Sequence, residues 1–265
     1  MIPKTIHYVW FGGNPLDERS ERCIASWREK CPDYRILRWD ESNFDVRRNK
    51  YCAEAYRQRK WAFVSDYARL WILVNHGGIY MDTDVEVIKP LDEFLHHEAF
   101  SGFQKTDEVP TGLMACRKGF PLFSEFLKDY DKRDFVFDEI NPDALTNVTA
   151  ITQACLRKGL VLDGSYQIVD GFALYPADWF CAKDVVTLQT NITGNTHSIH
   201  HFAGSWLSPA DKAIKDYKQV LLSRHQNMPN KVAGAVARLR YSVKSGDYKA
   251  IADGLKRHFT GQRNS

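Results

Sequence analysis

The stretch FVSDYARLWILVNHGGIYMDTD, residues 63–84, decides the fold of this chain. Apolar residues at helical spacing predict a helix over 62–75, and Gly77 stands in the usual position just past a helix end. A short apolar strand follows and ends in Asp82 and Asp84, one residue apart. Carboxylate oxygens suit hard cations such as Mg²⁺ and Mn²⁺, which neutralise the charge that grows on a departing diphosphate. The pattern predicts a metal site at the exit of a strand.

Strands and helices alternate on both sides of this stretch. We expect strands at 5–11, 34–39, 79–81, 85–88, 99–103, 112–116, 167–174 (with a kink at Gly171) and 196–202. We expect one further helix to begin near Asp17, with Asp17 as its N-cap. Other helices are expected over 52–58, 121–130 and 142–156. This alternation predicts an α/β fold with a mostly parallel sheet and an active site at the carboxyl ends of its strands.

Composition limits the class of protein. With 265 residues, 44% of them hydrophobic, the chain can bury the core of one large domain with a small appendage. Its six cysteines form no C-x-x-C pair, which favours reduced thiols in a cytosolic protein. The N-terminus lacks the pattern of a secretion signal, and no stretch approaches the roughly 20 apolar residues that span a bilayer. We therefore expect a cytoplasmic protein.

Charge is distributed unevenly, and the basic excess lies at the C-terminal end. From Pro229 to Ser265 there are eight Lys or Arg against Asp247 and Asp253, although the whole chain carries only +3. Apolar residues recur there at helical spacing: Val232, Val236, Leu239, Val243, Ile251, Leu255 and Phe259. We predict a catalytic domain over 1–227 and a basic amphipathic helical tail over 228–265. The tail either packs as a hairpin on the body or contacts anionic lipid, and nucleic acid is not an expected partner.

Three further positions carry chemistry. Asp66 and Arg69 are three apart on the predicted helix and share a face, so they form either a surface ion pair or a grip on sugar hydroxyls or phosphate. Trp10 ends the first strand before a glycine turn, where it serves as a core residue, as a platform for a nucleobase, or as both. Of the adjacent His200 and His201, at most one can face a given site, and an imidazole suits Mn²⁺ better than Mg²⁺.

In their order, these motifs strongly resemble glycosyltransferase family 32, the DXD-containing sugar transferases. This family includes bacterial capsule and surface-polysaccharide enzymes and the fungal initiating α-1,6-mannosyltransferase, and it is more distantly related to the glucosylating toxins. The resemblance covers roughly Ile2 to Trp206. It is carried by Ile2–Gly13, Ser26–Trp27, Pro32–Tyr34, Trp39, Ser65–Arg69, Gly77–Asp84 and His200–Trp206.

The resemblance implies a GT-A (Rossmann-like) fold with a C-terminal helical extension, a nucleotide-diphosphate sugar donor, Mn²⁺ or Mg²⁺, and retention of anomeric configuration. It implies catalytic roles for Asp66, Arg69 and Asp84. The metal would be held by Asp82, Asp84 and His200, with His201 as the second choice. The implied donor-binding residues are Val9, Trp10, Asp66, Arg69, Tyr80, Asp82, Thr83, Ser205 and Trp206.

We therefore expect a metal-dependent retaining glycosyltransferase of surface or capsular polysaccharide biosynthesis. It would move a hexose, preferably from a UDP-sugar, to a lipid-linked or growing polysaccharide acceptor. It would lie peripherally at the inner face of the membrane, with the tail on anionic lipid. A metal-dependent nucleotidyltransferase or sugar-nucleotide hydrolase is the alternative, and an inactive carbohydrate-binding module is a third interpretation.

Overall fold

The computed structural model of this protein describes residues 1–104, 107–136, 147–185, 187, 189–204, 209–225 and 228–246. The strands are β1 (Thr5–Val9), β2 (Arg35–Trp39), β3 (Gly78–Met81), β4 (Val85–Val87), β5 (Ala99–Gly102), β6 (Leu113–Cys116), β7 (Gln167–Val169), β8 (Phe172–Tyr175) and β9 (Ser198–His200). The α-helices are α1 (Glu18–Lys30), α2 (Lys50–Arg57), α3 (Trp61–His76), α4 (Pro121–Asp129), α5 (Asn147–Arg157), α6 (Ala177–Phe180), α7 (Pro209–Arg224) and α8 (Asn230–Ser245). Short 3₁₀ helices are η1 (Val46–Arg48), η2 (Asp92–Phe94) and η3 (Tyr130–Lys132).

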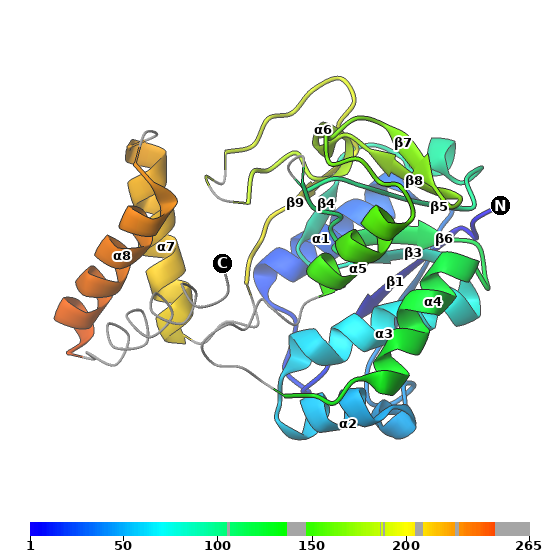
Figure 1. Ribbon diagram of the computed structural model, residues 1–265, viewed down its shortest axis with the longest axis horizontal. Helices are drawn as coiled ribbons and strands as arrows, with labels where there is room; N and C mark the ends of the chain where they lie inside the picture. The colour runs from blue at the N-terminus through cyan, green and yellow to red at the C-terminus, as the bar shows by residue number, and fades with distance from the viewer. Residues whose placement is uncertain are drawn as a thin grey trace. The chain divides into compact units, whose positions relative to one another are not determined.

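A seven-stranded sheet in the order β2-β1-β3-β6-β5-β8-β7 forms the centre of the first compact unit, which comprises 1–136, 147–183 and 190–202 in the described chain (Figure 1). β1 pairs in parallel with β2 and β3, and β5 with β8, whereas the other three pairs are antiparallel. A separate antiparallel pair, β4 with β9, follows the acidic strand end. The expected α/β fold is confirmed, and its sheet is mixed, with three parallel and three antiparallel strand pairs.

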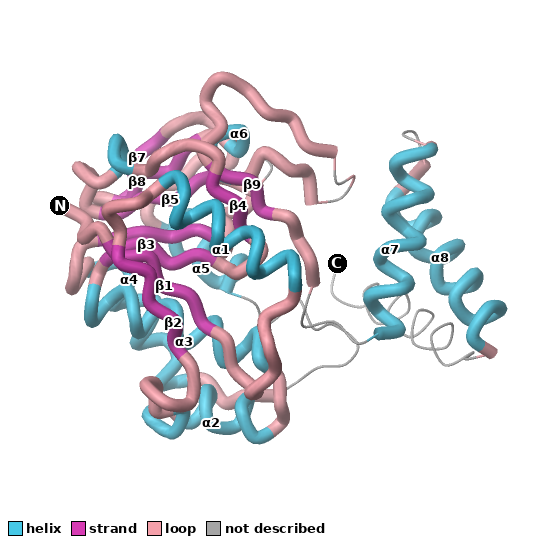
Figure 2. Tube along the Cα trace, turned by 180° about the vertical axis from the view of Figure 1, so that it is seen from behind, coloured by secondary structure: helices cyan, strands magenta, loops and turns pink. Residues whose placement is uncertain are grey.

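Helices cover both faces of this sheet. Strand side chains alternate between faces, so Ile6 and Tyr8 of β1 join the core that contains Ile24 and Trp27 of α1. Seen from behind, α1 crosses this face (Figure 2), while α3 and α4 lie side by side on the other (Figure 1). Trp27 is fully buried, and its indole N–H donates to the carbonyl of Val85 over 2.7 Å. This contact fixes α1 against the strand that follows the acidic pair.

Local sequence signals set the helix ends where we expected them. The side chain of Asp17 accepts a hydrogen bond from the backbone N–H of Ser20 over 2.8 Å and caps α1. Gly77 ends α3 with a φ of 69°, and its N–H donates to the carbonyl of Leu73 over 2.8 Å. A Cβ atom on Gly77 would lie 2.6 Å from the backbone nitrogen of Lys118, so only glycine fits where α3 turns into β3.

The side chain of His7 on β1 stabilises the same turn through a hydrogen bond to Gly77. It is 1% exposed; Trp39 donates its indole N–H to Nδ1 over 3.1 Å, and Nε2 lies 3.0 Å from the carbonyl of Gly77. Because a carbonyl only accepts, Nε2 carries the proton and Nδ1 does not. Burial lowers the pKa of His7 to about 4. A second proton on Nδ1 would oppose the Trp39 N–H, so His7 stabilises the fold only when neutral.

His7 makes stability depend on pH. Between pH 6.5 and pH 4 the unfolded chain binds a proton at His7 that the folded chain excludes, so the free energy of unfolding falls as pH is lowered through this window. The contribution is up to about 3 kcal/mol. We expect His7→Gln to flatten this part of the stability profile in urea titrations at pH 7.5, 6 and 4.5. The exposed His96→Gln should keep the wild-type slope; equal slopes for His7→Gln and wild type would contradict the assignment.

All six cysteines are buried as free thiols, in line with the reduced state expected from the sequence. Burial raises the pKa of Cys23, Cys52 and Cys155 to about 12. Since the thiolate is the reactive form, these side chains act as small apolar core residues.

The second compact unit contains α7 and α8, which pack on each other. Ala233 and Ala237 of α8 are fully buried, and Arg240 lies 4.7 Å above the ring of Tyr217 of α7. Helix α8 lies within the tail predicted over 228–265, of which residues 247–265 lie outside the described residues. Helical structure begins before residue 228, because α7 precedes that boundary. The sequence patterns did not predict α7. Ile214, Tyr217 and Leu221 are its helically spaced apolar residues, diluted among charges.

The apolar stripe expected on the tail lies on the exposed side of α8. Val232, Val236, Leu239 and Val243 are 47%, 40%, 54% and 67% exposed. The remaining expected members of the stripe, Ile251, Leu255 and Phe259, lie outside the described residues. None of the described helices combines the length and apolar character needed to cross a bilayer.

Candidate metal and donor site

The acidic pair lies where β3 leaves the sheet. Tyr80 is the third residue of β3 and is buried, while Asp82, Thr83 and Asp84 follow the strand and are half-buried. The backbone N–H of Asp82 donates to the carbonyl of Gly112 over 2.8 Å, so the segment before β6 holds the first residue of the pair. The two carboxylates therefore stand at the carboxyl edge of β3, as the sequence predicts.

His200 joins the two acids because β9 pairs with β4 in a register that sets Val85 opposite His200. Asp82, Asp84 and His200 each offer a ligand atom, and these atoms all lie within 4.8 Å of one another. Nε2 of His200 is 3.2 Å from Oδ1 of Asp84. Two carboxylates and one imidazole form a donor set that fits Mn²⁺ and, less well, Mg²⁺.

His201 points to another partner. Its Nε2 lies 2.8 Å from Oε2 of Glu86, and its backbone N–H donates to the carbonyl of Asp84 over 2.9 Å. The alternation of side chains along an extended chain accounts for this division between the two histidines. The structure brings His200, the first choice, to the acids, and His201 to Glu86.

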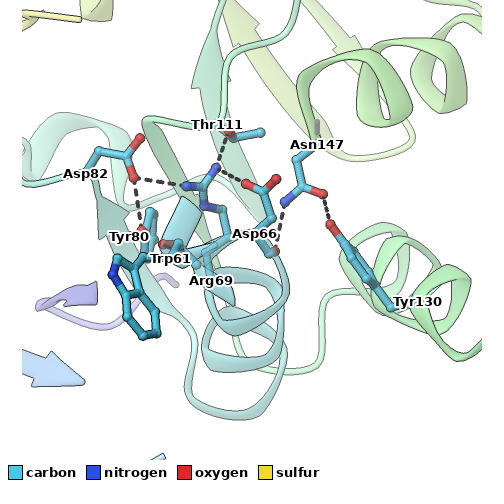
Figure 3. A network of polar contacts seen from close by, with 9 residues as sticks. Trp61, Asp66, Arg69, Tyr80, Asp82, Thr111, Tyr130 and Asn147 are labelled. Atoms are coloured by element: carbon cyan, nitrogen blue, oxygen red, sulfur yellow. Dashed lines mark hydrogen bonds and ion pairs between the residues drawn. The ribbon is translucent and has the colours of Figure 1, made fainter. Parts of the chain in front are cut away.

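Arg69 connects α3 to the acidic strand end (Figure 3). Its side chain is 6% exposed, and its terminal nitrogens lie 3.2 Å from Oδ1 of Asp66 and 3.0 Å from Oδ1 of Asp82. It also donates to the hydroxyl of Thr111, and the hydroxyl of Tyr80 donates to Oδ1 of Asp82 over 3.0 Å. Asp66 and Arg69 are thus a buried pair rather than a surface ion pair, and Arg69 orients the carboxylate of Asp82.

The electrostatics follow from this burial. Burial raises the pKa of Asp66 to about 6, with Arg69 opposing the shift and Asp82 adding to it. Burial also raises the pKa of Asp82, again against the attraction of Arg69. For His200, burial favours the neutral form, but the Asp84 carboxylate outweighs it and raises the pKa to about 10. The buried guanidinium of Arg69 balances the carboxylates of Asp66 and Asp82, and His200 would give up its proton to bind a cation.

Sequence reasoning missed the residues that support Asp66 and Arg69 from other elements. Asn147, the first residue of α5, donates its amide N–H to the backbone carbonyl of Asp66 over 2.8 Å and accepts a hydrogen bond from the hydroxyl of Tyr130 (Figure 3). Thr111, which receives Arg69, precedes β6. None of these residues belongs to a short motif, so only the tertiary fold reveals them.

Of the remaining expected donor-binding residues, the structure describes two at the end of β1 but not the two in the late motif. Val9 ends β1 and is buried, and Trp10 follows it half-buried, donating its indole N–H to the carbonyl of Asn14 over 2.7 Å. β1 runs parallel to β3, so both strands present their carboxyl ends at the same edge of the sheet. Trp10 also packs against the core, which agrees with the structural part of its expected role. Ser205 and Trp206 lie outside the described residues.

Comparison with known sequences locates the similarity in this region. Residues 17–101 match the family model described as a glycosyltransferase sugar-binding region containing a DXD motif. Inositol phosphoceramide mannosyltransferase 3 of Schizosaccharomyces pombe is 28% identical over 142 residues, which are 51% of this chain and 38% of that protein. The uncharacterized glycosyltransferase L373 of Acanthamoeba polyphaga mimivirus is 30% identical over 142 residues, 49% of this chain and 55% of that protein. The chain thus aligns with about half or less of the length of these relatives.

Solved structures that match parts of this chain are also named glycosyltransferases. The PaToxG glycosyltransferase has a TM-score of 0.46 and 20% identity, covering 60% of this chain and 70% of its own. The galactosyltransferase LgtC, solved with donor and acceptor sugar analogues, has a TM-score of 0.39 and 13% identity, covering 87% of this chain and 99% of its own.

Proposed function

For a GT32-like chain, whose residues 17–101 match the sugar-binding region of DXD glycosyltransferases, we propose transfer of a hexose from a nucleotide-diphosphate sugar with retention of configuration. The observation that carries the proposal is the convergence of Asp82, Asp84 and His200 beside the buried guanidinium of Arg69. One cation held by these three ligands would neutralise the charge of the departing diphosphate.

The chain's own residues supply positioning and charge. Arg69 holds Asp66 and Asp82 and places a positive charge at the edge where negative charge develops. Asp66, whose side chain is 10% exposed, offers a carboxylate to sugar hydroxyls, and Trp10 offers a ring to the nucleobase. Asp84 would bind the cation directly, and Asp82 would reach it directly or through a bound water, on the side of the ribose. We assign Ser205 and Trp206 to the diphosphate as a further part of the proposal.

The proposed reaction breaks the bond from the anomeric carbon to the β-phosphate oxygen and forms a bond from the same carbon to the acceptor oxygen, on the same face. The acceptor proton passes to the departing diphosphate oxygen, so atoms and charge balance. Retention then follows from front-face attack. Catalysis is mainly electrostatic, because preorganised charges face the group that becomes negative.

A nucleotide-sugar panel tests donor and metal together. We expect one of UDP-galactose, UDP-glucose, a UDP-N-acetylhexosamine or GDP-mannose to raise the melting temperature only when Mn²⁺ is present, with a UDP-sugar favoured. At a ligand concentration 100 times Kd, stabilisation is about 2.7 kcal/mol. The mannosyltransferase names among the relatives keep GDP-mannose in the panel. Sugar transfer to an acceptor, rather than bare hydrolysis, distinguishes a transferase from a sugar-nucleotide hydrolase, and a panel with no metal-dependent shift would contradict the proposal.

We further propose that the acceptor is a lipid-linked or growing surface polysaccharide, and that the α7–α8 unit binds an anionic membrane surface. The support is the exposed apolar stripe of α8 together with the basic residues of the same helix, Arg238, Arg240 and Lys244. Basic residues close to an anionic surface contribute about 1 kcal/mol each, and inserted apolar side chains add to this.

Vesicle co-sedimentation of the full chain tests this surface. We expect Val236→Asp/Leu239→Asp to weaken binding to phosphatidylserine-containing vesicles by about tenfold, because charge replaces apolar contact in the stripe. Ser223→Asp/Ser245→Asp adds the same charge to exposed positions outside the stripe and serves as the matched control. Equal loss in the two double variants would mean that charge alone acts, and unchanged binding in the first would remove the stripe from the proposal.

A further inference from the structure

Gly112 lies directly against the ring of His200. It is buried directly before β6, and a Cβ atom there would lie 2.8 Å from Cε1 and 2.9 Å from Nδ1 of His200. Real side chains do not tolerate such distances, so either the ring or the backbone would move. The φ of Gly112 lies outside the left-handed region, so its backbone is open to any residue. Glycine is therefore required at this position for space and not for conformation.

The same residue also fixes one of the acids. The carbonyl of Gly112 accepts the backbone N–H of Asp82 over 2.8 Å, and the preceding residue, Thr111, receives Arg69. The segment is tied to α5, because the backbone N–H of Val109 donates to the hydroxyl of Thr152 over 2.9 Å. Gly112 therefore sits on an anchored backbone, and an added methyl group would more readily displace the half-buried ring of His200 than this segment.

We propose that Gly112 is a positioning residue for the divalent cation. Because glycine has no side chain, the ring of His200 can occupy the space beside it, and this sets the distance between His200 and the two acids. This inference rests on the proposed function, since it concerns the same metal ligands. Residues that orient the ligands of a metal commonly change its affinity by 10–100-fold when replaced.

Direct Mn²⁺ titration, followed by the electron paramagnetic resonance signal of free Mn²⁺, tests the inference without an activity assay. We expect Gly112→Ala to weaken Mn²⁺ binding by about 10–100-fold. If the methyl group acts through the ring, it should have less than about a twofold effect in a His200→Ala background, where the ring is gone. Gly194→Ala is the matched control and should bind Mn²⁺ as wild type does. Gly194 has open space around it, and its φ, like that of Gly112, lies outside the left-handed region.

The possible outcomes distinguish the positioning role of Gly112 from the existence of the metal site. Equal effects of Gly112→Ala in both backgrounds, or no effect in either, would overturn the positioning role while leaving the metal site in place. Wild-type protein that binds no Mn²⁺ would overturn both this inference and the metal part of the proposed function. If Gly112→Ala alone does not fold, Gly112→Ala/His200→Ala is still expected to fold and to bind as His200→Ala does, and its failure to fold would contradict the inference.

Discussion

Asp84→Asn is expected to lower sugar transfer by about 10³-fold, equivalent to about 4 kcal/mol of transition-state stabilisation. The amide keeps the shape of the carboxylate but removes the negative charge that the cation needs. Asp84 is 3.2 Å from His200 and belongs to the group formed with Asp82, so the loss is expected in the ligand set of the proposed cation. The measurement is kcat with the preferred donor at saturating Mn²⁺, with circular dichroism to verify the fold.

Asp92→Asn is the control for this variant. Asp92 is 49% exposed and pairs with Lys4 on the surface, so the same change of charge there should leave kcat within about twofold. Near-normal transfer by Asp84→Asn would rule out the metal assignment, and an equal loss in Asp92→Asn would show that the effect is general.

Arg69→Ala is expected to destabilise the protein by about 3–5 kcal/mol, because removing one partner of a buried ion pair leaves uncompensated charge. Here two carboxylates, Asp66 and Asp82, lose their common partner, and the hydroxyl of Thr111 loses a donor. Arg69→Lys keeps the charge but not the planar fork that reaches all three groups, so it should restore only part of the stability. Urea unfolding at pH 7.5 measures both variants.

Arg57→Ala provides a matched comparison, because Arg57 also pairs with an acid three residues away on a helix. That arginine is 74% exposed, and its loss should cost less than about 1 kcal/mol. A similar cost for the two arginines would mean that the network around Arg69 contributes no more than a surface pair.

The sequence predicted the parts of the site that neighbouring residues determine. The cap at Asp17, the glycine end of α3 and the acidic exit of β3 depend on contacts within a few positions along the chain, and each was found where expected. Side-chain alternation also predicted that only one of His200 and His201 would face a given site. Which of the two joins the acids depends on the β4–β9 register, and that was not accessible from periodicity.

The missed parts depend on contacts distant in sequence. Thr111 receives an arginine 42 positions away, and Asn147 holds a carbonyl 81 positions away, and neither lies in a pattern that local chemistry explains. α7 was missed for a different reason. Its buried side packs on α8 through few apolar residues, so its hydrophobic period is weak in the sequence.

The burial of all six thiols gives the protein a practical property. A cysteine introduced at an exposed position would be much the fastest to react with maleimide reagents, because the natural thiols are buried and burial raises the pKa of Cys23, Cys52 and Cys155. A fluorophore could therefore be attached at one chosen point without removing any native cysteine. Labels placed beside the acidic strand end and on α8 would report separately on donor capture and on adsorption to lipid in the same intact chain.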